Sequence, residues 1–486
     1  MKVSSILYCA LFLFGTGIFN LTKAQAVNVD DSLALVDLYN STNGPAWTYH
    51  ANWLTEKPVS TWSGVTITDT RITSLDLEFN NLTGPIPSSI GNLTKLNYLE
   101  LQGNGLSGSI PSSIGKLVNL VALELQVNQL NGSIPSSIGK LSKLTGLNLA
   151  FNQLSGSLPY SFGNLLNLSY AELEYNQIST LPSSIGKLVN LNYLELVGNK
   201  LSGSIPSSIG KMLSLSYLNL SYNHLSGSIP SSFSKLANLG SLDLSNNQLT
   251  GEVPMYLFLK LLNLHTLYLM NNQLTKSNNY KYTQTPKHLG LSISISNNDL
   301  NFNLLEFIAY NYSRPNYAPQ ASIHIHQLSN GLSVDAGGTL KNNTYKWFKV
   351  GSTWSKTISG DSTFQPQKSG KYYAQVTNSI AWDLTLNTDT VSYKIPVIQS
   401  EQLTTMNDNA KVQSNLFRVY PNPASSIVHI QLSGTAVVTI TNSAGQVILV
   451  KTINNSSDID VSSFTNGIYY VQNGSNGQIQ KFVVLH

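Results

Sequence analysis

The chain of 486 residues contains one cysteine, few charged residues and no long internal apolar run. Because the one thiol is Cys9, near the N-terminus, zinc–thiolate sites, cysteine nucleophiles and stabilising disulfides are excluded. Only 11% of residues are charged, the formal net charge is +4, and lysine and arginine do not cluster. This pattern argues against a nucleic-acid-binding protein. Beyond the N-terminal segment, no apolar stretch reaches the ~18 residues of a membrane helix.

The N-terminus has the order of a cleavable secretory signal. Met1-Lys2 precedes an apolar run from Ile6 to Phe19, and the small residues of Ala24-Gln25-Ala26 follow. We therefore expect residues 1–26 to be a signal peptide. A lipid anchor on Cys9 is the alternative, but the apolar run continues past that residue.

From Arg71 the sequence repeats with a period of 24 residues, as in the segments that begin at Lys95 and Asn119. A fixed period of this length is typical of a solenoid, and residues 71–310 would form about ten coils. An asparagine recurs once per coil. These asparagines are Asn80, Asn104, Asn128, Asn152, Asn176, Asn199, Asn223, Asn247, Asn272 and, less regularly, Asn298.

The repeat alternates apolar and polar residues before each asparagine. In the stretch from Tyr98 to Gln102, alternation directs Leu99 and Leu101 inward and the other three side chains outward. One short strand per coil predicts a parallel sheet. The asparagine amide can satisfy backbone groups in the following turn, so the stacked coils would carry a structural asparagine ladder.

The motif LxxLxLxxNxLxGxIPxxIGxL resembles the plant-type leucine-rich repeat. That resemblance implies a curved array with strands on its concave side and loops or irregular helix on its convex side. Residues 27–70 resemble the N-terminal cap of such arrays without its cysteine pair, so buried tryptophans would replace the cross-link. We expect Asp30 or Asp31 to cap a helix that runs through Tyr39.

Two further domains are expected after the array. Residues 318–397 resemble an immunoglobulin-like β-sandwich, with Trp347 in the core and Tyr372 as a tyrosine corner. Residues 398–412 are polar and are expected to be a linker. The whole chain is thus predicted to be a mainly β solenoid, with an N-terminal cap, an Ig-like β-sandwich and a small C-terminal β-sandwich.

Residues 415–486 carry a series of motifs that begins with Tyr420-Pro421-Asn422-Pro423. In this order they resemble the C-terminal sorting domain of type IX secretion in Bacteroidetes. The resemblance implies passage across the outer membrane through the type IX export machinery, usually with removal of this domain. The product would be secreted or displayed on the cell surface. The alternative is that the segment is only a stabilising β-sandwich.

The strand pattern places acidic and tyrosine residues together on the solvent side of the strands, here called the concave face. The outward positions before, between and after the two inward leucines of each strand form three columns along the array. Eight of the ten carboxylates between Arg71 and Leu300 lie in these columns, whereas lysines such as Lys116 recur on the convex side. Like-charged neighbours in adjacent strands repel, which suggests a positively charged partner. The candidate ligand-binding residues are Asp76, Glu78, Tyr98, Glu100, Glu124, Tyr170, Glu172, Glu174, Tyr193, Glu195, Tyr217 and Asp243.

Our first hypothesis is a non-enzymatic protein that binds a protein or peptide of basic character on this face, around Glu172 and Glu195. A glycan-binding adhesin is the second, because tyrosines stack on sugars and carboxylates accept hydroxyl hydrogens. A structural spacer that displays the Ig-like domain is the third. Inheritance of glutamate with a duplicated repeat would also explain the acidic columns without any ligand.

An enzyme is not expected, because no catalytic constellation can be assembled. His324 and His326 would share one strand face, but no third metal ligand is near them in the sequence. Glutamate pairs on an open sheet cannot exclude water as glycosidase carboxylates must. No phosphate-binding glycine loop is present either. We therefore predict no cofactor and no metal. A calcium site made of paired carboxylates is an alternative, although no loop has calcium-binding spacing.

Overall fold

The computed structural model describes residues 27–275, 290–312, 315–329, 331–395, 417–443, 446–475 and 477–485. The predicted signal peptide, the irregular segment around 278–287 and the predicted linker lie outside the described residues. The chain forms two compact units, Met1–Pro396 and Val397–His486, and each is described by itself. No described helix is long and apolar enough to cross a membrane.

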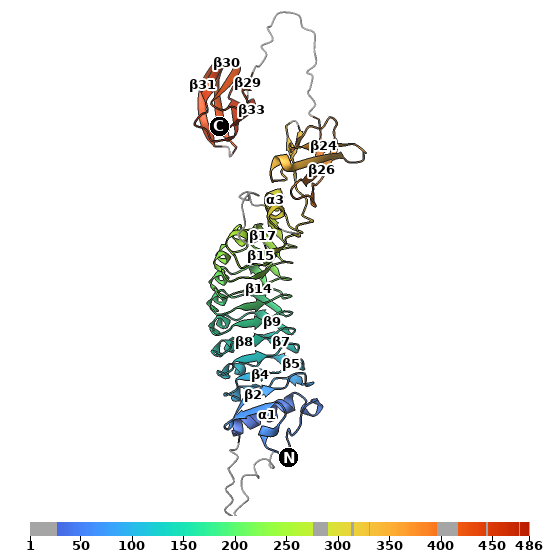
Figure 1. Ribbon diagram of the computed structural model, residues 1–486, viewed down its shortest axis with the longest axis vertical. Helices are drawn as coiled ribbons and strands as arrows, with labels where there is room; N and C mark the ends of the chain where they lie inside the picture. The colour runs from blue at the N-terminus through green and yellow to red at the C-terminus, as the bar shows by residue number, and fades with distance from the viewer. Residues whose placement is uncertain are drawn as a thin grey trace, which may run out of the picture. The chain divides into compact units, whose positions relative to one another are not determined.

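The first unit is built on an eleven-stranded sheet with one strand per coil (Figure 1). β1 pairs with β2 in an antiparallel manner, and every later neighbour is parallel. The strands are β1 (Val65–Thr68), β2 (Arg71–Asp76), β4 (Tyr98–Glu100), β6 (Ala122–Glu124), β8 (Gly146–Asn148), β10 (Tyr170–Glu172), β12 (Tyr193–Glu195), β14 (Tyr217–Asn219), β16 (Ser241–Asp243), β18 (Thr266–Tyr268) and β20 (Ser292–Ser294).

The repeat places equivalent residues in register, and the inward leucines form the core. Leu99 pairs with Leu123 in the next strand, and both are fully buried, as is Leu101. The inward positions predicted from the alternation are therefore confirmed. Burial of one leucine side chain contributes about 1.5–3 kcal/mol, and each coil repeats the contribution.

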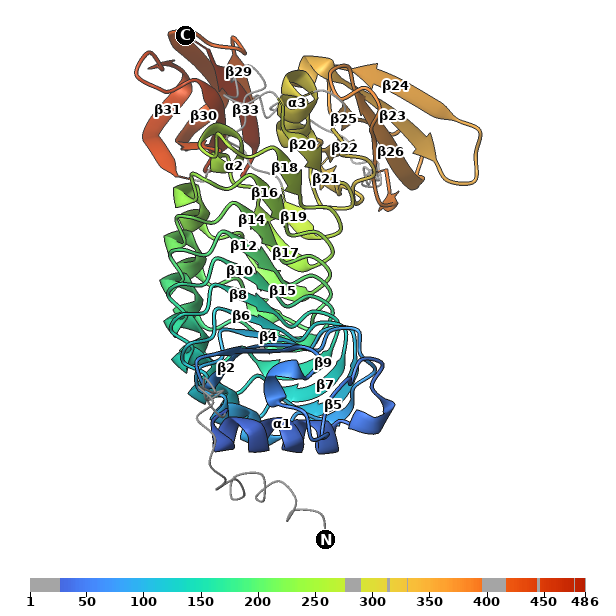
Figure 2. The same cartoon turned by 60° about the horizontal axis from the view of Figure 1, so that its bottom comes forward.

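A second set of strands follows the asparagine turns and forms two further parallel sheets (Figure 2). One contains β3 (Thr83–Pro85), β5 (Gly105–Ser109), β7 (Gln129–Ser133), β9 (Gln153–Ser157) and β11 (Gln177–Thr180). The other contains β13 (Ser202–Ser204), β15 (His224–Gly227), β17 (Gln248–Glu252) and β19 (Gln273–Thr275).

Short 3-10 helices close each coil on the convex side. They are η4 (Ser88–Asn92), η5 (Ser112–Lys116), η6 (Ser136–Lys140), η7 (Tyr160–Asn164), η8 (Ser183–Lys187), η9 (Ser207–Lys211) and η10 (Ser231–Lys235). Glycine is needed there because a Cβ on Gly115 would lie 2.4 Å from the carbonyl oxygen of Ser137 in the next coil. In the coil after η10, the corresponding segment forms the short α-helix α2 (Tyr256–Leu259) instead of a 3-10 helix.

The N-terminal cap starts with helix α1 (Val29–Ser41), whose cap is Asn28. The helix runs through Tyr39 as expected, but the expectation of an aspartate cap was wrong. Asn28 accepts from the backbone N–H groups of Asp30 and Asp31, while the Asp31 carboxylate is buried. There it pairs with Arg71 at 2.8 Å, which links the helix to the first repeat strand. Asp31 is thus used between elements and not at the helix end.

Three tryptophans fill the rest of the cap. The 3-10 helix η2 (Gly44–Ala46) directly precedes Trp47, and η3 (Val59–Thr61) directly precedes Trp62. Trp53 contacts both Trp47 and Trp62, with ring centroids 4.8 Å apart in each pair, and all three side chains are buried. Their burial agrees with the expectation that aromatic packing replaces a disulfide.

Helix α3 (Phe302–Asn311) ends the array and binds the following β-domain. Glu306 is only 2% exposed, and its carboxylate accepts from the Thr339 N–H at 2.9 Å, the Thr339 hydroxyl, and the amides of Asn342 and Asn378. The array and this β-domain share one buried hydrogen-bond network and one hydrophobic core. They are therefore packed together and are not separate folding units.

The β-domain has two sheets and a short 3-10 helix, η11 (Leu340–Asn342). One sheet contains β21 (Ile325–Leu328), β22 (Gly331–Val334) and β25 (Thr363–Phe364), and the other contains β24 (Ser355–Ser359), β23 (Asn343–Lys349), β26 (Gly370–Asn378), β27 (Thr385–Asn387) and β28 (Val391–Tyr393). Trp347 is fully buried, and the Tyr372 hydroxyl donates to the Lys368 carbonyl at 2.6 Å. These contacts fit the predicted roles, while the Ig-like identity stays a prediction.

The second unit contains β29 (Phe417–Tyr420), β30 (Ile427–Asn442), β31 (Val447–Asp460), β32 (Gly467–Asn473) and β33 (Ile479–Val484). These five strands are joined by one continuous set of hydrogen-bonded pairings, and their arrangement as a sandwich stays a prediction. Strand β30 is long enough to pair with β29 through its first half and with β32 through its second half. Its buried side chains join one core that includes Val428, Ile440 and Phe482.

Candidate ligand-binding face

The acidic residues of the concave face stand in register along the sheet. Glu100 pairs with Glu124, and Glu172 pairs with Glu195, as the repeat spacing predicts. The three outward columns contain no lysine or arginine from Ser74 to Met270. The protein therefore supplies no cation within the columns to neutralise these carboxylates.

Tyr170 crosses one strand to reach an acid two coils away. Gly146 lies between them, and a Cβ added there would be 2.2 Å from the Tyr170 hydroxyl oxygen. The hydroxyl donates to Glu124 Oε1 at 2.6 Å. The missing side chain at Gly146 thus lets the ring lie flat on the sheet, and burial still raises the pKa of Glu124.

A second cluster contains Tyr193, Glu195 and Tyr217. The tyrosine rings stack with centroids 4.3 Å apart, and the Tyr193 hydroxyl donates to Glu195 Oε2 at 3.1 Å. Glu195 is only 7% exposed, and burial raises its pKa although both tyrosine hydroxyls favour its charged form. Tyr170, Tyr193 and Tyr217 lie on the solvent side as expected, but each packs on neighbouring side chains and is half-buried.

Glu174 is the acid with the strongest shift. Burial, reinforced by the nearby charges of Glu172 and Glu195, raises the pKa of Glu174 to about 7. Its Oε2 is buried without a hydrogen-bond donor among the described residues. Burial also raises the pKa of Glu172, which accepts a hydrogen bond from Asn148. A cation placed beside this carboxylate would favour its ionised form.

The remaining predicted residues extend the face towards both ends of the array. Gln102 donates to Glu78 at 2.5 Å, and the N–H of Glu78 donates to Asp76 at 3.3 Å. Tyr98 is 44% exposed, the most open tyrosine of the predicted set. Burial raises the pKa of Glu100. At the other end, Asp243 accepts from the Ser245 hydroxyl at 2.6 Å, and burial raises the pKa of Asp243.

Not every member of the three columns reaches solvent, which corrects the expectation of a uniformly open face. Ala150, Ser221 and Ser245 are buried. The two serines are short and fold back on the residue two positions earlier, as in the bond from Ser245 to Asp243. The most exposed members of the three columns are Asp76, Glu78 and Tyr98, in the first coils of the array.

The asparagines bind the coils together beneath the edge of this face. Asn152 donates to the carbonyls of Leu125, Leu149 and Ala150, while its Oδ1 accepts from the N–H of Leu130 at 2.9 Å. Equivalent bonds are made by Asn104, Asn128, Asn176, Asn199, Asn223, Asn247, Asn272 and Asn298. Asn80 differs, because its amide donates to the Tyr49 carbonyl in the cap.

The residues directly before the ladder asparagines form a further column along the array, which was not predicted from the sequence. Its exposed members, here called the αL ridge, have positive φ and are Phe79, Val127, Phe151, Tyr175 and Tyr222. Other coils place Gly103, Gly198 or Asn246 at the same step. The signal available in the sequence was this alternation of glycine or asparagine with large apolar residues.

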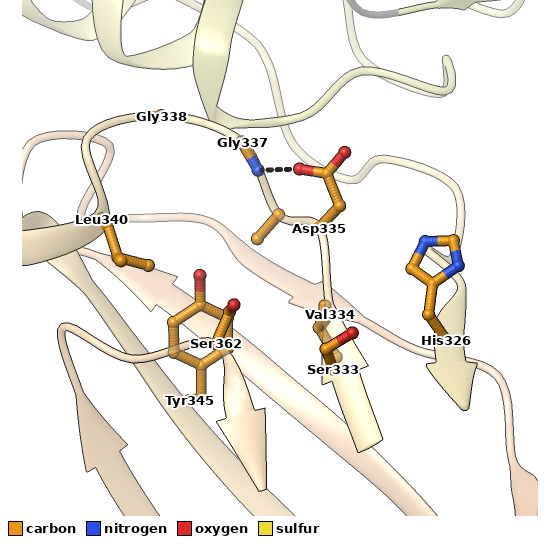
Figure 3. Close-up of a pocket in the computed structure, with 10 residues that line it drawn as sticks. His326, Ser333, Val334, Asp335, Gly337, Gly338, Leu340, Tyr345 and Ser362 are labelled. Carbon is orange, nitrogen blue, oxygen red and sulfur yellow. Dashed lines mark hydrogen bonds between the residues drawn. The ribbon is translucent and has the colours of Figure 1, made fainter. Parts of the chain in front are cut away.

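The histidine pair does not make a metal site in the described part of the chain. His324 Nδ1 lies 2.6 Å from Asp389 Oδ2. His326 lines a cavity of about 230 Å³ together with Asp335 and Tyr345 (Figure 3). Within this loop, Asp335 accepts from the Gly337 N–H at 3.2 Å. No group of three potential metal ligands occurs among the residues whose positions are described.

The predicted sorting motif is attached to the last strand of the second unit. Asn422 Oδ1 accepts from the Val483 N–H at 2.8 Å, and its amide donates to the Lys481 carbonyl at 3.2 Å. Tyr420 is exposed, with its ring 5.5 Å from that of His429, and Pro421 and Pro423 flank the asparagine. The motif therefore closes the C-terminal sheet.

Comparison with known families divides the chain in the same way. The leucine rich repeat family matches residues 70–130, 135–201 and 204–249. The family described as secretion system C-terminal sorting domain matches residues 418–485. No curated protein matches the chain.

Solved plant proteins share the repeat architecture. The Arabidopsis receptor kinase HAESA, in complex with the peptide hormone IDA and the co-receptor SERK1, is 29% identical with a TM-score of 0.51, over 61% of this chain and 50% of that chain. The plant peptide hormone receptor RGFR1, in complex with RGF2, is 32% identical with a TM-score of 0.45, over 51% and 40%. A plant ice-binding protein is 27% identical with a TM-score of 0.49, over 61% and 100%.

The present chain thus spans half or less of the length of the two receptor ectodomains. The repeat likeness and the C-terminal match concern different parts of it. Together with the parallel sheet, they show that the chain contains leucine-rich repeats with a fold similar to that of a plant receptor ectodomain, followed by a secretion-system sorting domain.

Proposed function

We propose that the chain is an exported, non-enzymatic binding protein that recognises a basic protein or peptide on its concave face. The observation that carries the proposal is the row of carboxylates without a cation, including the unpartnered Oε2 of Glu174. Buried acids with raised pKa values are held at a cost that a cationic ligand would offset. The likeness to a receptor solved with a peptide hormone supports the same class of ligand.

Export is proposed to follow from the sorting domain, with a secreted or cell-surface product after passage through type IX machinery. The match at residues 418–485 supports this route. Origin in the Bacteroidetes and removal of the signal and sorting segments belong to the same proposal.

The binding proposal is tested with the double substitution Glu172→Lys and Glu195→Gln. Lysine reverses the charge at the open position, while glutamine keeps the shape of the buried one. Glu252→Lys is the matched control, since Glu252 is exposed on β17, away from the concave face. A library of random dodecapeptides selected on the wild-type chain should yield basic sequences that bind the control and fail on the double variant. Equal binding to all three proteins would refute the proposal.

Glycan recognition remains the second candidate function, because tyrosines and carboxylates occur together near Glu195. The stacked Tyr193 and Tyr217 rings, however, already cover one face of each other. A glycan array that gives hits dependent on Glu172, with no peptide selected, would favour this candidate over the first.

A further inference from the structure

The αL ridge combines exposure with an unfavourable backbone conformation. Its five side chains are between 48% and 66% exposed, and their φ angles lie between 46° and 55°. Glycine adopts this region freely and asparagine tolerates it, whereas large or β-branched residues are strained there. These positions therefore carry apolar side chains at the expense of folding stability.

Coils nearer the C-terminal end of the array carry asparagine at this position, which is less strained there than a large apolar residue. Asn246, Asn271 and Asn297 occupy the equivalent step, and Asn271 donates to Asn246 at 2.7 Å while Asn297 donates to Asn271 at 2.6 Å. Asparagine thus suits both the turn and its neighbours. Strain concentrated in exposed aromatic residues of one region indicates an interaction surface.

The ridge borders the acidic face along its length. Each ridge residue directly follows a member of the outermost column, as Tyr175 follows Glu174 and Phe79 follows Glu78. A partner that lies over the carboxylates would also meet the ridge. Apolar and acidic surface side by side complements a segment in which basic and apolar side chains alternate.

Ring orientation favours protein over sugar as the partner. A Cβ on Gly103 would lie 2.3 Å from the Phe79 ring, and one on Gly198 would lie 2.8 Å from the Tyr175 ring, so these rings rest on the next coil. Phe151 stacks on Tyr175 with centroids 4.7 Å apart. Sugar binding needs an open ring face, whereas apolar side chains can pack against the exposed ring edges.

We propose that the αL ridge is the apolar half of the binding surface and receives apolar side chains of an extended basic segment of a partner protein. This inference rests on the proposed function, whose acidic residues bind the basic side chains of the same segment. The ridge then selects among basic ligands, since carboxylates alone would accept any of them.

Two synthetic octapeptides test the proposal on the full chain, one alternating arginine with leucine and the other arginine with serine. They carry equal charge, so a difference in affinity reports apolar contacts. The wild-type chain should bind the leucine peptide at least about tenfold more tightly. The double variant Phe151→Asn, Tyr175→Asn should bind both peptides equally, with the affinity of the wild type for the serine peptide.

The melting temperature distinguishes the cost of the ridge to folding from its role in binding. The same double variant should melt about 2–4 °C or more above the wild type, because asparagine relieves strain. Tyr160→Asn is the control, as Tyr160 is an exposed aromatic residue of η7 on the convex side, without positive φ. It should leave peptide selectivity unchanged.

The outcomes distinguish the ridge from the acidic face. Selectivity that is absent in the wild type, or retained by the double ridge variant, would overturn the ridge proposal while leaving the acidic site standing. Binding of both peptides that ignores Glu172→Lys and Glu195→Gln would overturn the proposed function instead. If neutral glycans bound the wild type but not the ridge variant, the proposal of a protein partner would also be overturned.

Discussion

Asn152 shows how a single side chain stabilises the stacking of coils. Replacement by alanine would leave the buried Leu130 N–H without its acceptor and remove three bonds to carbonyls, each of which keeps one other donor. We expect Asn152→Ala to lower the free energy of unfolding by about 1–3 kcal/mol in urea titrations. Asn190→Ala is the control, because exposed Asn190 makes one side-chain bond, to Leu166, and should cost less than about 0.5 kcal/mol. Equal losses would contradict the ladder's role.

Glu174 should make stability depend on pH near neutrality. Its pKa is about 7 in the folded chain, above the ordinary value of 4.5, so folding favours the protonated form. The contribution is complete below pH 4.5 and is lost as pH rises through 7. Glu174→Gln should therefore flatten the decline in melting temperature between pH 5 and pH 8, whereas exposed Glu252→Gln should not. An unchanged decline in Glu174→Gln would show that another group causes it.

Residue-level contacts across two coils were beyond the sequence interpretation. Alternation predicted that Leu99 and Leu101 are buried, since strand geometry alone decides the side of each residue. It could not predict that Tyr170 reaches Glu124, because that contact depends on the absent side chain at Gly146. The strain of Tyr175 was likewise hidden, since φ is a property of the turn.

At the scale of elements, α3 is the joint between the array and the β-domain. The Glu306 carboxylate collects four hydrogen-bond donors from the β-domain while almost fully buried. Glu306→Ala should cost at least about 3 kcal/mol, because charged acceptors contribute more than neutral ones. Calorimetry should show the β-domain melting before the array in this variant. One unchanged transition would mean that apolar contacts alone hold the joint.

Element boundaries followed tertiary contacts that no local pattern reveals. The helix α1 begins one residue after Asn28 because Asp31 is held by Arg71, forty residues away in the sequence. Likewise, β30 pairs with three strands of the second unit because it is sixteen residues long, and no local pattern predicts that length. The repeat strands were predicted well, since each is specified by its own coil.

At the scale of the whole molecule, the sorting domain should decide where the chain goes. A chain that ends at residue 416 lacks the segment that matches the sorting family. In a host with type IX secretion we expect it to accumulate in the periplasm, while the full chain reaches the surface or the medium. Fractionation with antibodies to the array would measure this. Undiminished export of the shortened chain would leave the C-terminal sheet with only a stabilising role.

Charge is distributed across the width of the array, with carboxylates such as Glu172 on the concave face and lysines such as Lys187 on the convex side. Attraction of a basic peptide to such a face must weaken as salt shortens the screening length, which is about 8 Å at 0.15 M ionic strength. The alternating arginine–serine peptide should thus bind at least about tenfold more weakly at 1 M than at 0.05 M salt. The single variant Glu172→Gln, which removes one carboxylate and adds no positive charge, should show a shallower dependence in the same titrations. If both proteins gave equal slopes, the attraction would come from elsewhere on the chain.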